Sequence, residues 1–445
     1  MKPWQVLHLD LNDGISDLAL DPNYSGLRLI LWSQDLPLGH VDLDAQQLPI
    51  SQIDLTNRIV AAIAPTIGNY LIDPGFSGQL PYIAETDREA PALSDVLALS
   101  MPFAQLQSVG FERNDATVSV VVCTRDRPEL LQACLRSLNA LDPAPMEIIV
   151  VDNASSSEAT RQVVSEFSTV RYVQEPRPGL SIARNTGIRE SRGALIAFTD
   201  DDVTVHPHWI TQVQQAFADD QTVAITGLIL PQKIETEAQL LFEKDLAWFH
   251  QGYRSKRFDR AFFAATQHLG APVWEIGAGA NMAFRRSIFD AIGVFDERLG
   301  AGQAGCSEDS ELWYRILAEG WTCRYEPSAI VYHTHRGDLE SLRRQLYQYL
   351  RGHVVALLIQ FDRYHHRGNL RRLCLGLPKY YLQTFLAQAV RGRHQMNRLL
   401  FVQMRGTIAG IFYYFTQCKF SAEAKLTSVQ HKSFAAITNS ESPSE

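Results

Sequence analysis

Blocks of apolar residues separated by polar segments predict most of the fold. The runs at 118–124, 147–153 and 195–199 are short and mostly apolar, as in strands that are buried on both faces, and the first two are rich in β-branched residues. Between them, 130–138 and 179–190 carry apolar residues at helical spacing. Strands that alternate with helices in this way predict right-handed βαβ units and a parallel sheet, whose strand ends converge on one edge.

The first 72 residues have a different pattern, which predicts a small α+β domain. Strands are expected at 4–11 and 27–32, and the second is expected to turn through 35–39, with a glycine in the loop, into a hairpin partner. A helix should then begin after Ser51, a capping residue, and stop at Pro65. No motif in this domain is typical of catalysis.

Composition divides the rest of the chain. Pro, Ser and acidic residues are frequent after the first domain, which indicates a linker, and the C-terminal end is polar and aperiodic, which indicates a tail. The predicted segments are 1–72, an α+β accessory domain; 73–116, a linker; 117–335, the α/β domain; 336–420, a basic helical region; and 421–445, a disordered tail.

Charge is distributed unevenly over the 445 residues. The formal net charge is −8, but 336–420 contains fourteen Lys or Arg against three acidic residues, so this region carries +11 and the remainder about −19. Six cysteines without a C-x-x-C pair predict neither a zinc site nor a disulfide framework. Acidic residues interrupt the N-terminal segment and no long apolar run is present, so we expect a cytoplasmic protein without a membrane span.

Three consecutive carboxylates, Asp200, Asp201 and Asp202, end the apolar run that begins at Leu195. They fall at the carboxyl end of a predicted strand, where open α/β sheets bind their ligands. Adjacent like charges raise one another's proton affinity unless a cation lies among them, and a hard divalent ion such as Mg²⁺ or Mn²⁺ suits oxygen ligands. The alternative is that they solvate a turn or cap the next helix.

Two other strand ends offer further chemistry. Thr124, Arg125 and Arg127 follow the first strand and bring two guanidinium groups to a phosphate, and Asp152 and Asn153 end the second strand with acceptors for a base or ribose. Taken singly, Arg125 is a surface charge and Asp152 a turn residue. Together they predict a site for a nucleotide diphosphate. The first strand is followed by neither G-x-x-x-x-G-K-[ST] nor G-x-G-x-x-G, which argues against ATPases and dinucleotide enzymes.

Six short motifs follow one another in the α/β domain. They are Val-Ser-Val-Val-Val-Cys-Thr-Arg-Asp-Arg-Pro128, Ile-Val-Val-Asp-Asn153, Gly179-Leu-Ser-Ile-Ala-Arg-Asn-Thr-Gly187, Phe198-Thr-Asp-Asp-Asp202, Gly277-Ala-Gly-Ala-Asn-Met282 and Glu308-Asp309. Their succession resembles the family 2 glycosyltransferases of the GT-A fold. The resemblance implies a Rossmann-like, nucleotide-sugar-binding sheet sandwiched by helices. It also implies transfer of a sugar, with inversion, from a nucleotide-sugar donor to a glycan or lipid-linked acceptor.

The resemblance implies roles for individual residues as well. Asp152 would contact the nucleotide base, and Arg184 would lie near the base or the diphosphate. Asp200, Asp201 and Asp202 would form the D-x-D motif, in which Asp200 faces the sugar nucleotide and Asp202 is the principal metal ligand. A divalent ion there would stabilise the charge that develops on the departing diphosphate.

An inverting transfer also needs a base for the acceptor hydroxyl. The resemblance selects Asp309, with Glu308 as its neighbour or substitute, at the start of a helix expected to run to Ala318. Ser307 as an N-cap followed by acidic residues is, however, ordinary helix chemistry. The glycines of 300–305 fit either a mobile loop over the acceptor or a passive connection.

Two further patterns are expected near the site. The small residues of 277–284 would line the acceptor side or allow close packing of strand and helix. His333 and His335 lie two apart in a predicted strand, so both imidazoles point to one face. They would complete the metal shell or hold the diphosphate, unless they are structural.

The basic region has a helical pattern, with helices expected at 339–361, 370–390 and 396–420. Cationic amphipathic helices suit the surface of an anionic membrane, where a lipid-linked acceptor would be found. A packed helical cap or a dimer interface explains the pattern equally well. Nucleic acid is not expected as a partner, because the rest of the chain is acidic.

Two other functions fit part of the sequence. A sugar-1-phosphate nucleotidyltransferase also lays a nucleotide across such a sheet, but it would carry a glycine-rich loop after the first strand, where this chain has Thr-Arg-Asp-Arg-Pro128. A non-catalytic glycan-binding scaffold would not need an intact Asp202 and Asp309. The predicted function is therefore a metal-assisted, inverting glycosyltransferase of hexosyltransferase type.

Overall fold

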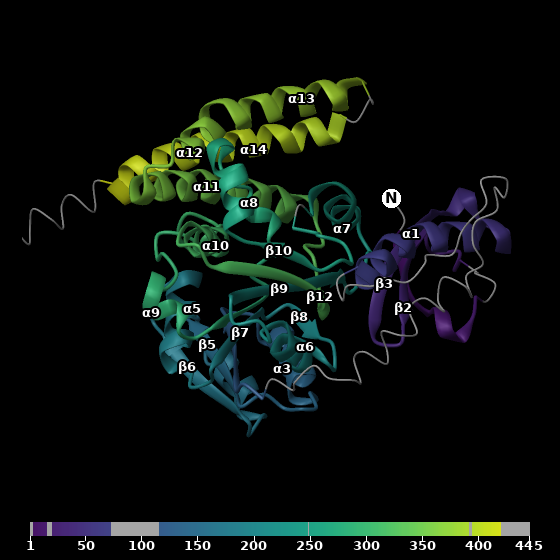
Figure 1. The fold of residues 1–445 in the computed structure, drawn as a ribbon, viewed down its shortest axis with the longest axis horizontal. Coiled ribbons are helices and arrows are strands. Elements are labelled where there is room, and N and C mark those ends of the chain that lie inside the picture. Colours follow the sequence, from purple (N-terminus) through teal and green to yellow (C-terminus); the bar gives the residue numbers. More distant parts are fainter. Residues whose placement is uncertain (1–2, 16–19, 73–114, 248, 391–393, 420–445) are drawn as a thin grey trace, which may run out of the picture.

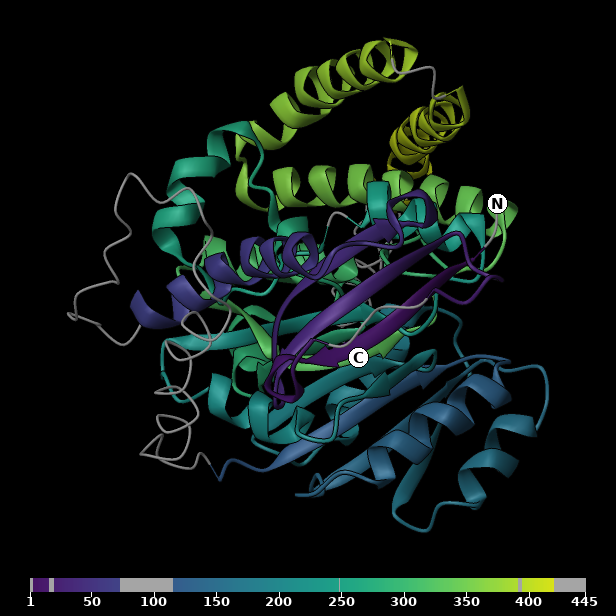
Figure 2. The same cartoon turned by 90° about the vertical axis from the view of Figure 1, so that its right-hand side faces the viewer.

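The computed structural model describes residues 3–15, 20–72, 115–247, 249–390 and 394–419. The predicted tail, and the predicted linker except for residues 115 and 116, lie outside this part. Figures 1 and 2 show a small N-terminal sheet with one helix, a large sheet between helices, and a layer of C-terminal helices.

The large sheet has the strand order β10-β12-β9-β11-β7-β4-β5-β6, and β8 pairs with β12 outside this order. Its strands are β4 (Val118–Thr124), β5 (Glu147–Asn153), β6 (Val170–Glu175), β7 (Leu195–Asp200), β8 (Val203–Val205), β9 (Thr222–Pro231), β10 (Lys256–Phe258), β11 (Asn281–Arg285) and β12 (Thr322–His333). As predicted, β7, β4, β5 and β6 are parallel. The sheet as a whole is mixed, because β11 runs antiparallel to both β7 and β9.

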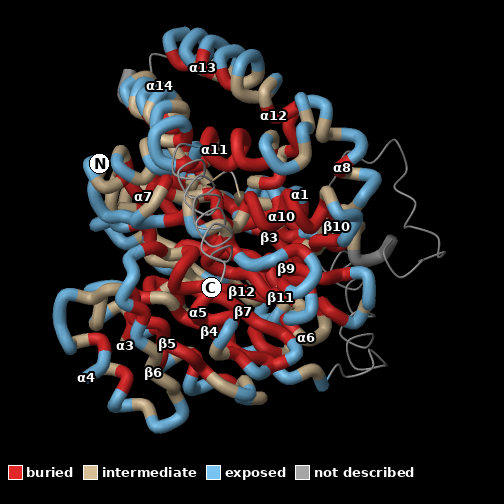
Figure 3. The backbone as a smooth tube through the Cα atoms, turned by 90° about the vertical axis from the view of Figure 1, so that its left-hand side faces the viewer, coloured by how far each residue is buried: buried red, intermediate tan, exposed pale blue. Residues whose placement is uncertain are grey.

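Helices cover both faces of this sheet. They are α3 (Pro128–Asn139), α4 (Ala159–Ser165), α5 (Leu180–Glu190), α6 (Trp209–Ala216), α7 (Glu237–Leu241), α8 (Arg260–Thr266), α9 (Ile288–Ile292) and α10 (Glu308–Ala318), with a π-helical turn η3 (Phe242–Leu246) and the 3₁₀ turns η4 (Gln267–Leu269) and η5 (Val273–Glu275). Because side chains alternate along a strand, Val120 and Val122 of β4 pack with α3, α4 and α6, while Val121 packs in the core of α5, α9 and α10. The buried sheet between two helical layers is visible in Figure 3.

The N-terminal part folds as a three-stranded sheet covered by one helix. It contains β1 (Trp4–Asp10), β2 (Gly26–Ser33), β3 (Leu36–Asp44) and α1 (Gln52–Ile72), with the short turns η1 (Leu11–Asp13) and η2 (Ala45–Gln47). The first two strands are parallel and the last two antiparallel. The Ser51 hydroxyl accepts a hydrogen bond from the Asp54 backbone N–H at 3.1 Å, so Ser51 caps α1 as predicted.

Two predicted details of this part are wrong. The hairpin turns at Gln34 and Asp35, so Gly39 lies inside β3, where a Cβ would approach the Ala62 carbonyl oxygen of α1 to 2.9 Å. This glycine therefore allows a close contact between sheet and helix rather than a turn. Helix α1 also continues through Pro65, because a proline removes one backbone hydrogen bond and kinks a helix without having to end it.

The small sheet lies between α1 and the large sheet, and β2 is buried on both faces. Its three leucines, at positions 27, 29 and 31, pack with α1. On the opposite face, Ile30 and Trp32 pack against Leu228 of β9 and Ile330 of β12. By the alternation of side chains along a strand, Arg28 also faces the large domain.

The C-terminal region forms the predicted helices. They are α11 (Leu339–Tyr364), α12 (Arg367–Arg371), α13 (Leu377–Val390) and α14 (His394–Tyr413), with the π-helical turns η6 (Arg372–Gly376) and η7 (Tyr414–Lys419). Helix α11 contacts both α10 and α14, and α13 pairs with α14. In Figure 1 these helices form a layer over the large domain on the side of α8 and α10.

Candidate active site

The carboxyl ends of β4, β5 and β7 lie side by side, as predicted. Thr124 pairs with Asp152 across β4 and β5, and Cys123 pairs with Asp200 across β4 and β7. A cavity of about 770 Å³ opens at this edge of the sheet, which is within the size range of small-molecule sites.

Ten of the twelve predicted site residues line this cavity, including Asp202 from the carboxylate triplet and Asp309 from the start of α10. The ten are Thr124, Arg125, Arg127, Arg184, Asp200, Asp201, Asp202, Glu308, Asp309 and His333. Side chains of the C-terminal helices form another part of the wall, among them Tyr349 and His353 of α11 and Tyr380 of α13. The cavity is thus enclosed between the sheet edge and the C-terminal layer.

Asp152 and His335 are the two predicted residues that do not line the cavity. Asp152 is only 2% exposed, and its carboxylate accepts hydrogen bonds from the hydroxyls of Tyr172, at 2.7 Å, and Ser155. The next residue, Asn153, lines the cavity instead, and its side-chain oxygen accepts the Gly179 N–H at 2.9 Å. The structure therefore brings Asn153, and not Asp152, to the cavity.

Asp201 is the most enclosed member of the triplet. Its carboxylate accepts hydrogen bonds from the Thr124 hydroxyl at 2.7 Å and from Arg127 Nη1 at 2.9 Å. Burial raises the pKa of Asp201 to about 6, although the charge of Arg127 acts in the other direction. Arg125 lies at the same strand end with a half-exposed side chain, so its guanidinium remains accessible to an anion in the cavity.

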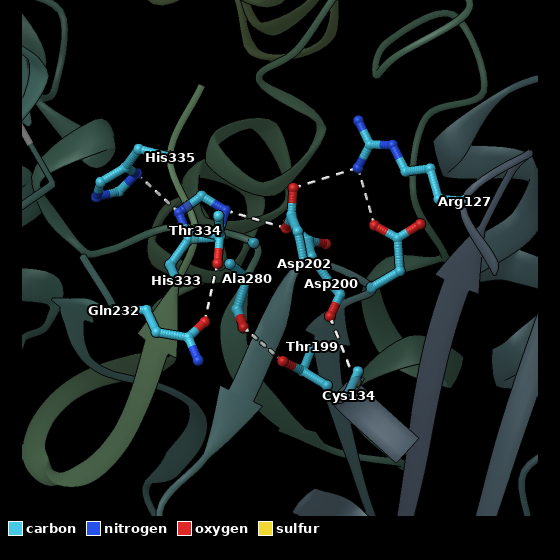
Figure 4. A network of polar contacts seen from close by, with 12 residues as sticks. Arg127, Cys134, Thr199, Asp200, Asp202, Gln232, Ala280, His333, Thr334 and His335 are labelled. Carbon is cyan, nitrogen blue, oxygen red and sulfur yellow. Dashed lines mark hydrogen bonds and ion pairs between the residues drawn. The ribbon is translucent and has the colours of Figure 1, made fainter. Parts of the chain in front are cut away.

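Asp202 contacts two cationic partners, which Figure 4 shows from close by. Its Oδ2 accepts from Arg127 Nη1 at 3.2 Å, and its Oδ1 lies 3.0 Å from His333 Nε2. Burial favours the protonated carboxyl, but His333 and Arg127 outweigh it and hold the pKa of Asp202 well below its usual range. The same contact raises the pKa of His333 against the effect of burial.

One buried guanidinium faces the carboxylates on the other side of the cavity. Arg184 of α5 donates to Glu308 Oε1 at 2.6 Å and to Asp200 Oδ1 at 3.3 Å. The Gly279 N–H donates to Asp309 Oδ2 at 2.9 Å and orients that side chain. Burial raises the pKa of Glu308 to about 7 and also raises the pKa of Asp309, although the charge of Arg184 acts in the other direction.

The segment before α10 does not behave as an ordinary helix cap. Ser307 has a left-handed backbone, with φ of 69°, and its side chain makes no capping hydrogen bond. The loop 300–305 is tied to both neighbouring layers, since Ala301 O accepts the Leu180 N–H at 2.9 Å and Arg351 of α11 donates to Ala304 O at 2.7 Å. These contacts place the carboxylates of α10 at the cavity.

Sequence reasoning missed two groups of residues around the site. Glu243 of η3 lies 2.5 Å from His335 Nε2, a contact between positions 92 residues apart for which no local motif exists. Tyr349 and His353 lie on the inner side of α11. The helical spacing of α11 indicates a buried face, but not what that face encloses.

The predicted metal ligands offer one suitable donor pair. Asp202 Oδ1 and His333 Nε2 lie 3.0 Å apart, which is about the separation of adjacent ligands on an octahedral ion with bonds of about 2.1 Å. Asp200 faces Arg184 instead, and His335 lies behind His333. Within the described residues no group of three His, Cys, Asp or Glu side chains could hold an ion alone. A divalent cation would therefore need phosphate and water ligands in addition, as Mg²⁺ sites usually have.

Comparisons with known proteins find a family model and relatives that this chain resembles. The family model described as "Glycosyl transferase family 2" matches residues 119–293. Glycosyltransferase AglE of Haloferax volcanii is 33% identical over 235 residues, which are 51% of this chain and 70% of AglE. Succinoglycan biosynthesis protein ExoM of Rhizobium meliloti is 30% identical over 230 residues, which are 48% of this chain and 66% of ExoM. A solved structure, mannosyltransferase PcManGT from Pyrobaculum calidifontis in complex with GDP-Man and Mn²⁺, has a TM-score of 0.45 and 15% identity, over 71% of this chain and 94% of its own.

A mixed sheet between helical layers, with a cavity at the carboxyl ends of its parallel strands, defines an α/β domain of the predicted GT-A class. The chain belongs to glycosyltransferase family 2. It spans about two thirds of the length of ExoM and AglE, and the family model covers neither the N-terminal sheet nor the C-terminal helices.

Proposed function

We propose that this protein is a metal-assisted, inverting glycosyltransferase, which moves a sugar from a nucleotide-sugar donor to a hydroxyl of a glycan or lipid-linked acceptor. One observation supports it most: Asp202 with His333, and Asp309, line the same cavity although they come from different elements. Transfer requires a place for the departing diphosphate and a base for the acceptor within one site.

The donor is expected to lie along the ends of β4 and β7. Arg125 and Arg127 offer guanidinium groups to the diphosphate, and Asp201 holds Arg127 in place. Asp202 and His333 would hold the divalent cation, Mg²⁺ or Mn²⁺, which when bound stabilises the charge on the leaving diphosphate.

Asp309 is the proposed base on the acceptor side. The acceptor oxygen attacks the anomeric carbon from the face opposite the diphosphate, so that the new bond forms as the bond to the diphosphate breaks. The hydroxyl proton passes to the carboxylate of Asp309. Burial raises the pKa of Asp309, which makes it a stronger base than a solvated aspartate. Turnover should therefore fall on the acidic side at a pH above the ordinary range of aspartate.

Two isosteric substitutions test these roles separately. A donor is first found by thermal stabilisation of the protein with a panel of nucleotide sugars and Mn²⁺. Asp309→Asn should then retain donor affinity while turnover falls by about 10² to 10⁴. Asp202→Asn should lose the Mn²⁺-dependent part of donor binding. Asp290→Asn, at an exposed position of α9, is the matched control.

The possible outcomes separate the two assignments. Turnover of Asp309→Asn at the wild-type rate would move the base to another residue. Calorimetric donor affinity of Asp202→Asn that still depends on Mn²⁺ as in wild type would remove the metal assignment.

We further infer that the outer face of the C-terminal helices binds an anionic membrane. Within the described residues, fifteen large apolar side chains are exposed, and ten of them lie between Leu375 and Phe415. Between Arg367 and Lys419 the sequence has nine Lys or Arg and no Asp or Glu. An apolar and purely cationic face suits anionic lipid. A second copy docking through the same face would meet like charges.

The position of this face agrees with a lipid-linked acceptor, since Tyr380 and Gln403 of the same helices line the cavity from inside. No helix in the described ranges is long and apolar enough to cross a membrane.

Flotation with vesicles tests the membrane assignment. Replacing Phe385, Phe401 and Phe412 together by serine should lower partition into phosphatidylglycerol-rich vesicles by at least about tenfold, because each buried phenylalanine contributes about 1.5 to 3 kcal/mol. The control replaces Ile53 and Leu269, which are exposed elsewhere. Equal flotation of the triple variant and wild type would contradict the assignment.

A further inference from the structure

A buried chain of polar groups connects the N-terminal sheet with Asp202. Arg28 Nη1 of β2 donates to Glu243 Oε2 at 2.6 Å, and Glu243 Oε1 lies 2.5 Å from His335 Nε2. His335 Nδ1 then faces His333 Nδ1 at 2.9 Å, and His333 Nε2 faces Asp202 Oδ1 at 3.0 Å. Figure 4 shows the last two of these contacts.

The inner members of this chain are shielded from water. The side chains of Arg28, Glu243 and His335 are 6%, 2% and 3% exposed. A buried polar group without a partner is costly, so each hydrogen in the chain must have a defined position. Asp42 holds the far side of Arg28 with two hydrogen bonds, of 2.8 and 2.9 Å.

The chemistry of the two ends decides where these hydrogens lie. The guanidinium of Arg28 only donates, and the carboxylate of Glu243 only accepts. His335 Nε2 must therefore carry a hydrogen, which leaves Nδ1 of the neutral imidazole as an acceptor. His333 Nδ1 must then donate to His335. In the metal-free protein His333 Nε2 faces the Asp202 carboxylate, which only accepts, so this nitrogen carries a hydrogen as well and His333 is cationic. When a cation takes the place of that hydrogen, the hydrogen on Nδ1 stays and the lone pair of His333 is on Nε2, beside Asp202.

We propose that Arg28 and Glu243 are positioning residues, which fix the tautomer of His335 and through it keep a hydrogen on His333 Nδ1, so that His333 Nε2, next to Asp202, is the nitrogen that can give a lone pair to a cation. This inference rests on the proposed function, in which that nitrogen and the Asp202 carboxylate hold a divalent cation. Partners behind a ligating histidine commonly set its tautomer and orientation. Here the outermost partner comes from the N-terminal sheet, outside the match to the family model.

Glu243→Gln reverses the donor and acceptor roles in this series of hydrogen bonds, while the side chain at position 243 keeps its shape. Arg28 attracts the amide oxygen, so the amide nitrogen turns toward His335. His335 Nε2 must then accept and its Nδ1 carries the hydrogen. His333 Nδ1 must therefore accept, and the remaining hydrogen of His333 lies on Nε2, toward Asp202. The double variant Arg28→Met/Glu243→Gln removes the guanidinium, which frees the amide to turn back and restore the wild-type arrangement.

Nitrogen-15 NMR of the full chain, labelled at histidine and free of metal, reports the tautomer of His335, and His335→Gln assigns its signals. We expect Nε2–H in wild type, Nδ1–H in Glu243→Gln and Nε2–H again in the double variant. Calorimetric affinity for Mn²⁺ alone should fall by about tenfold to a hundredfold in the single variant and recover in the double variant. Glu237→Gln, the same charge removal on α7, is the control and should change neither quantity.

Two results would overturn the proposal. One is an unchanged His335 tautomer in Glu243→Gln. The other is an equal loss of Mn²⁺ affinity in the single and double variants together with an equal loss of thermal stability, which would show a structural role only. If Asp202→Asn binds Mn²⁺ like wild type, the metal assignment itself fails. The tautomer measurement is made without metal and decides the histidine arrangement independently.

Discussion

Replacing Arg184 by methionine keeps a long, helix-compatible side chain but removes the positive charge that Glu308, Asp200 and Asp309 share. In the structure the guanidinium lies 2.6 Å from Glu308 Oε1 and 3.3 Å from both Asp200 Oδ1 and the Gly279 carbonyl oxygen. The Arg184 side chain is 3% exposed, so solvent screens these contacts little. The stability of the variant should therefore depend on the protonation of its carboxylates.

The loss of folding stability in Arg184→Met should change with pH. Burial raises the pKa of Glu308 to about 7 with Arg184 present, so below pH 7 this carboxyl is protonated in both proteins. There the variant loses only hydrogen bonds of the guanidinium, about 1 to 3 kcal/mol in total. A carboxyl with a raised folded-state pKa contributes stability that is lost as the pH rises through that pKa.

Above pH 7 the folding stabilities of wild type and Arg184→Met diverge. Wild type has already lost this contribution, whereas the variant, with a still higher folded-state pKa, continues to lose about 1.4 kcal/mol per pH unit. The deficit should approach the 3 to 5 kcal/mol, roughly, that a broken buried ion pair costs.

Urea denaturation of the full chain, followed by circular dichroism at about pH 6 and about pH 9 without divalent cations, measures this difference. Arg184→Met/Glu308→Gln should recover most of the part that depends on pH, because no carboxylate is then left unpaired at position 308. Arg189→Met, on the exposed side of α5, is the control. An equal deficit of Arg184→Met at both pH values, or no recovery in the double variant, would refute the reasoning.

Two further predictions concern packing. A Cβ at Gly227 would lie 2.0 Å from the Ala329 carbonyl oxygen, so Gly227→Ala should cost at least about 2 kcal/mol and lower the thermal midpoint, whereas Gly337→Ala, with no atom within 4 Å, should change little. Cys374 is exposed and Cys134 is buried, so a thiol reagent should modify Cys374 rapidly and Cys134 only in urea. Rapid modification of Cys134 in the native protein, detected by mass spectrometry, would contradict the packing of α3.

Sequence pattern alone predicts the elements whose partners are close along the chain. The strands β4 to β7 and the helices between them follow from apolar runs and helical spacing, because each βαβ unit is closed by local connections. For the same reason the sequence predicts that the side chains at the ends of β4 and β7 lie at one edge of the sheet. The antiparallel strand β11 does not follow from this alternation.

The pleat of a strand limits such predictions at the level of single residues. Asp152 and Asn153 are adjacent at the end of β5, and successive side chains of a strand point to opposite faces. Asp152 turns toward Tyr172 and Ser155, while Asn153 reaches the cavity. The resemblance identifies the motif, but a shift of one residue decides which side chain lines the cavity.

Contacts between distant segments could not be predicted at all. Arg28 and Glu243 are 215 residues apart, and each on its own is an unremarkable charged residue in the sequence. The C-terminal helices illustrate the same limit, since their pattern fits both a packed cap and a membrane surface. In the structure their inner side packs on α10 and lines the cavity. Membrane binding by the outer side, and a cytoplasmic location, stay predictions.

The contact between Arg28 and Glu243 has a practical consequence for anyone who dissects this enzyme. A fragment that starts at β4 would contain every recognisable family motif, yet it would leave Glu243 without its countercharge and expose the apolar surface that Ile30 and Trp32 cover. The smallest fragment that keeps these contacts is therefore longer than the segment that identifies the family. Chimaeras between relatives should exchange the first 72 residues together with η3 and the end of β12.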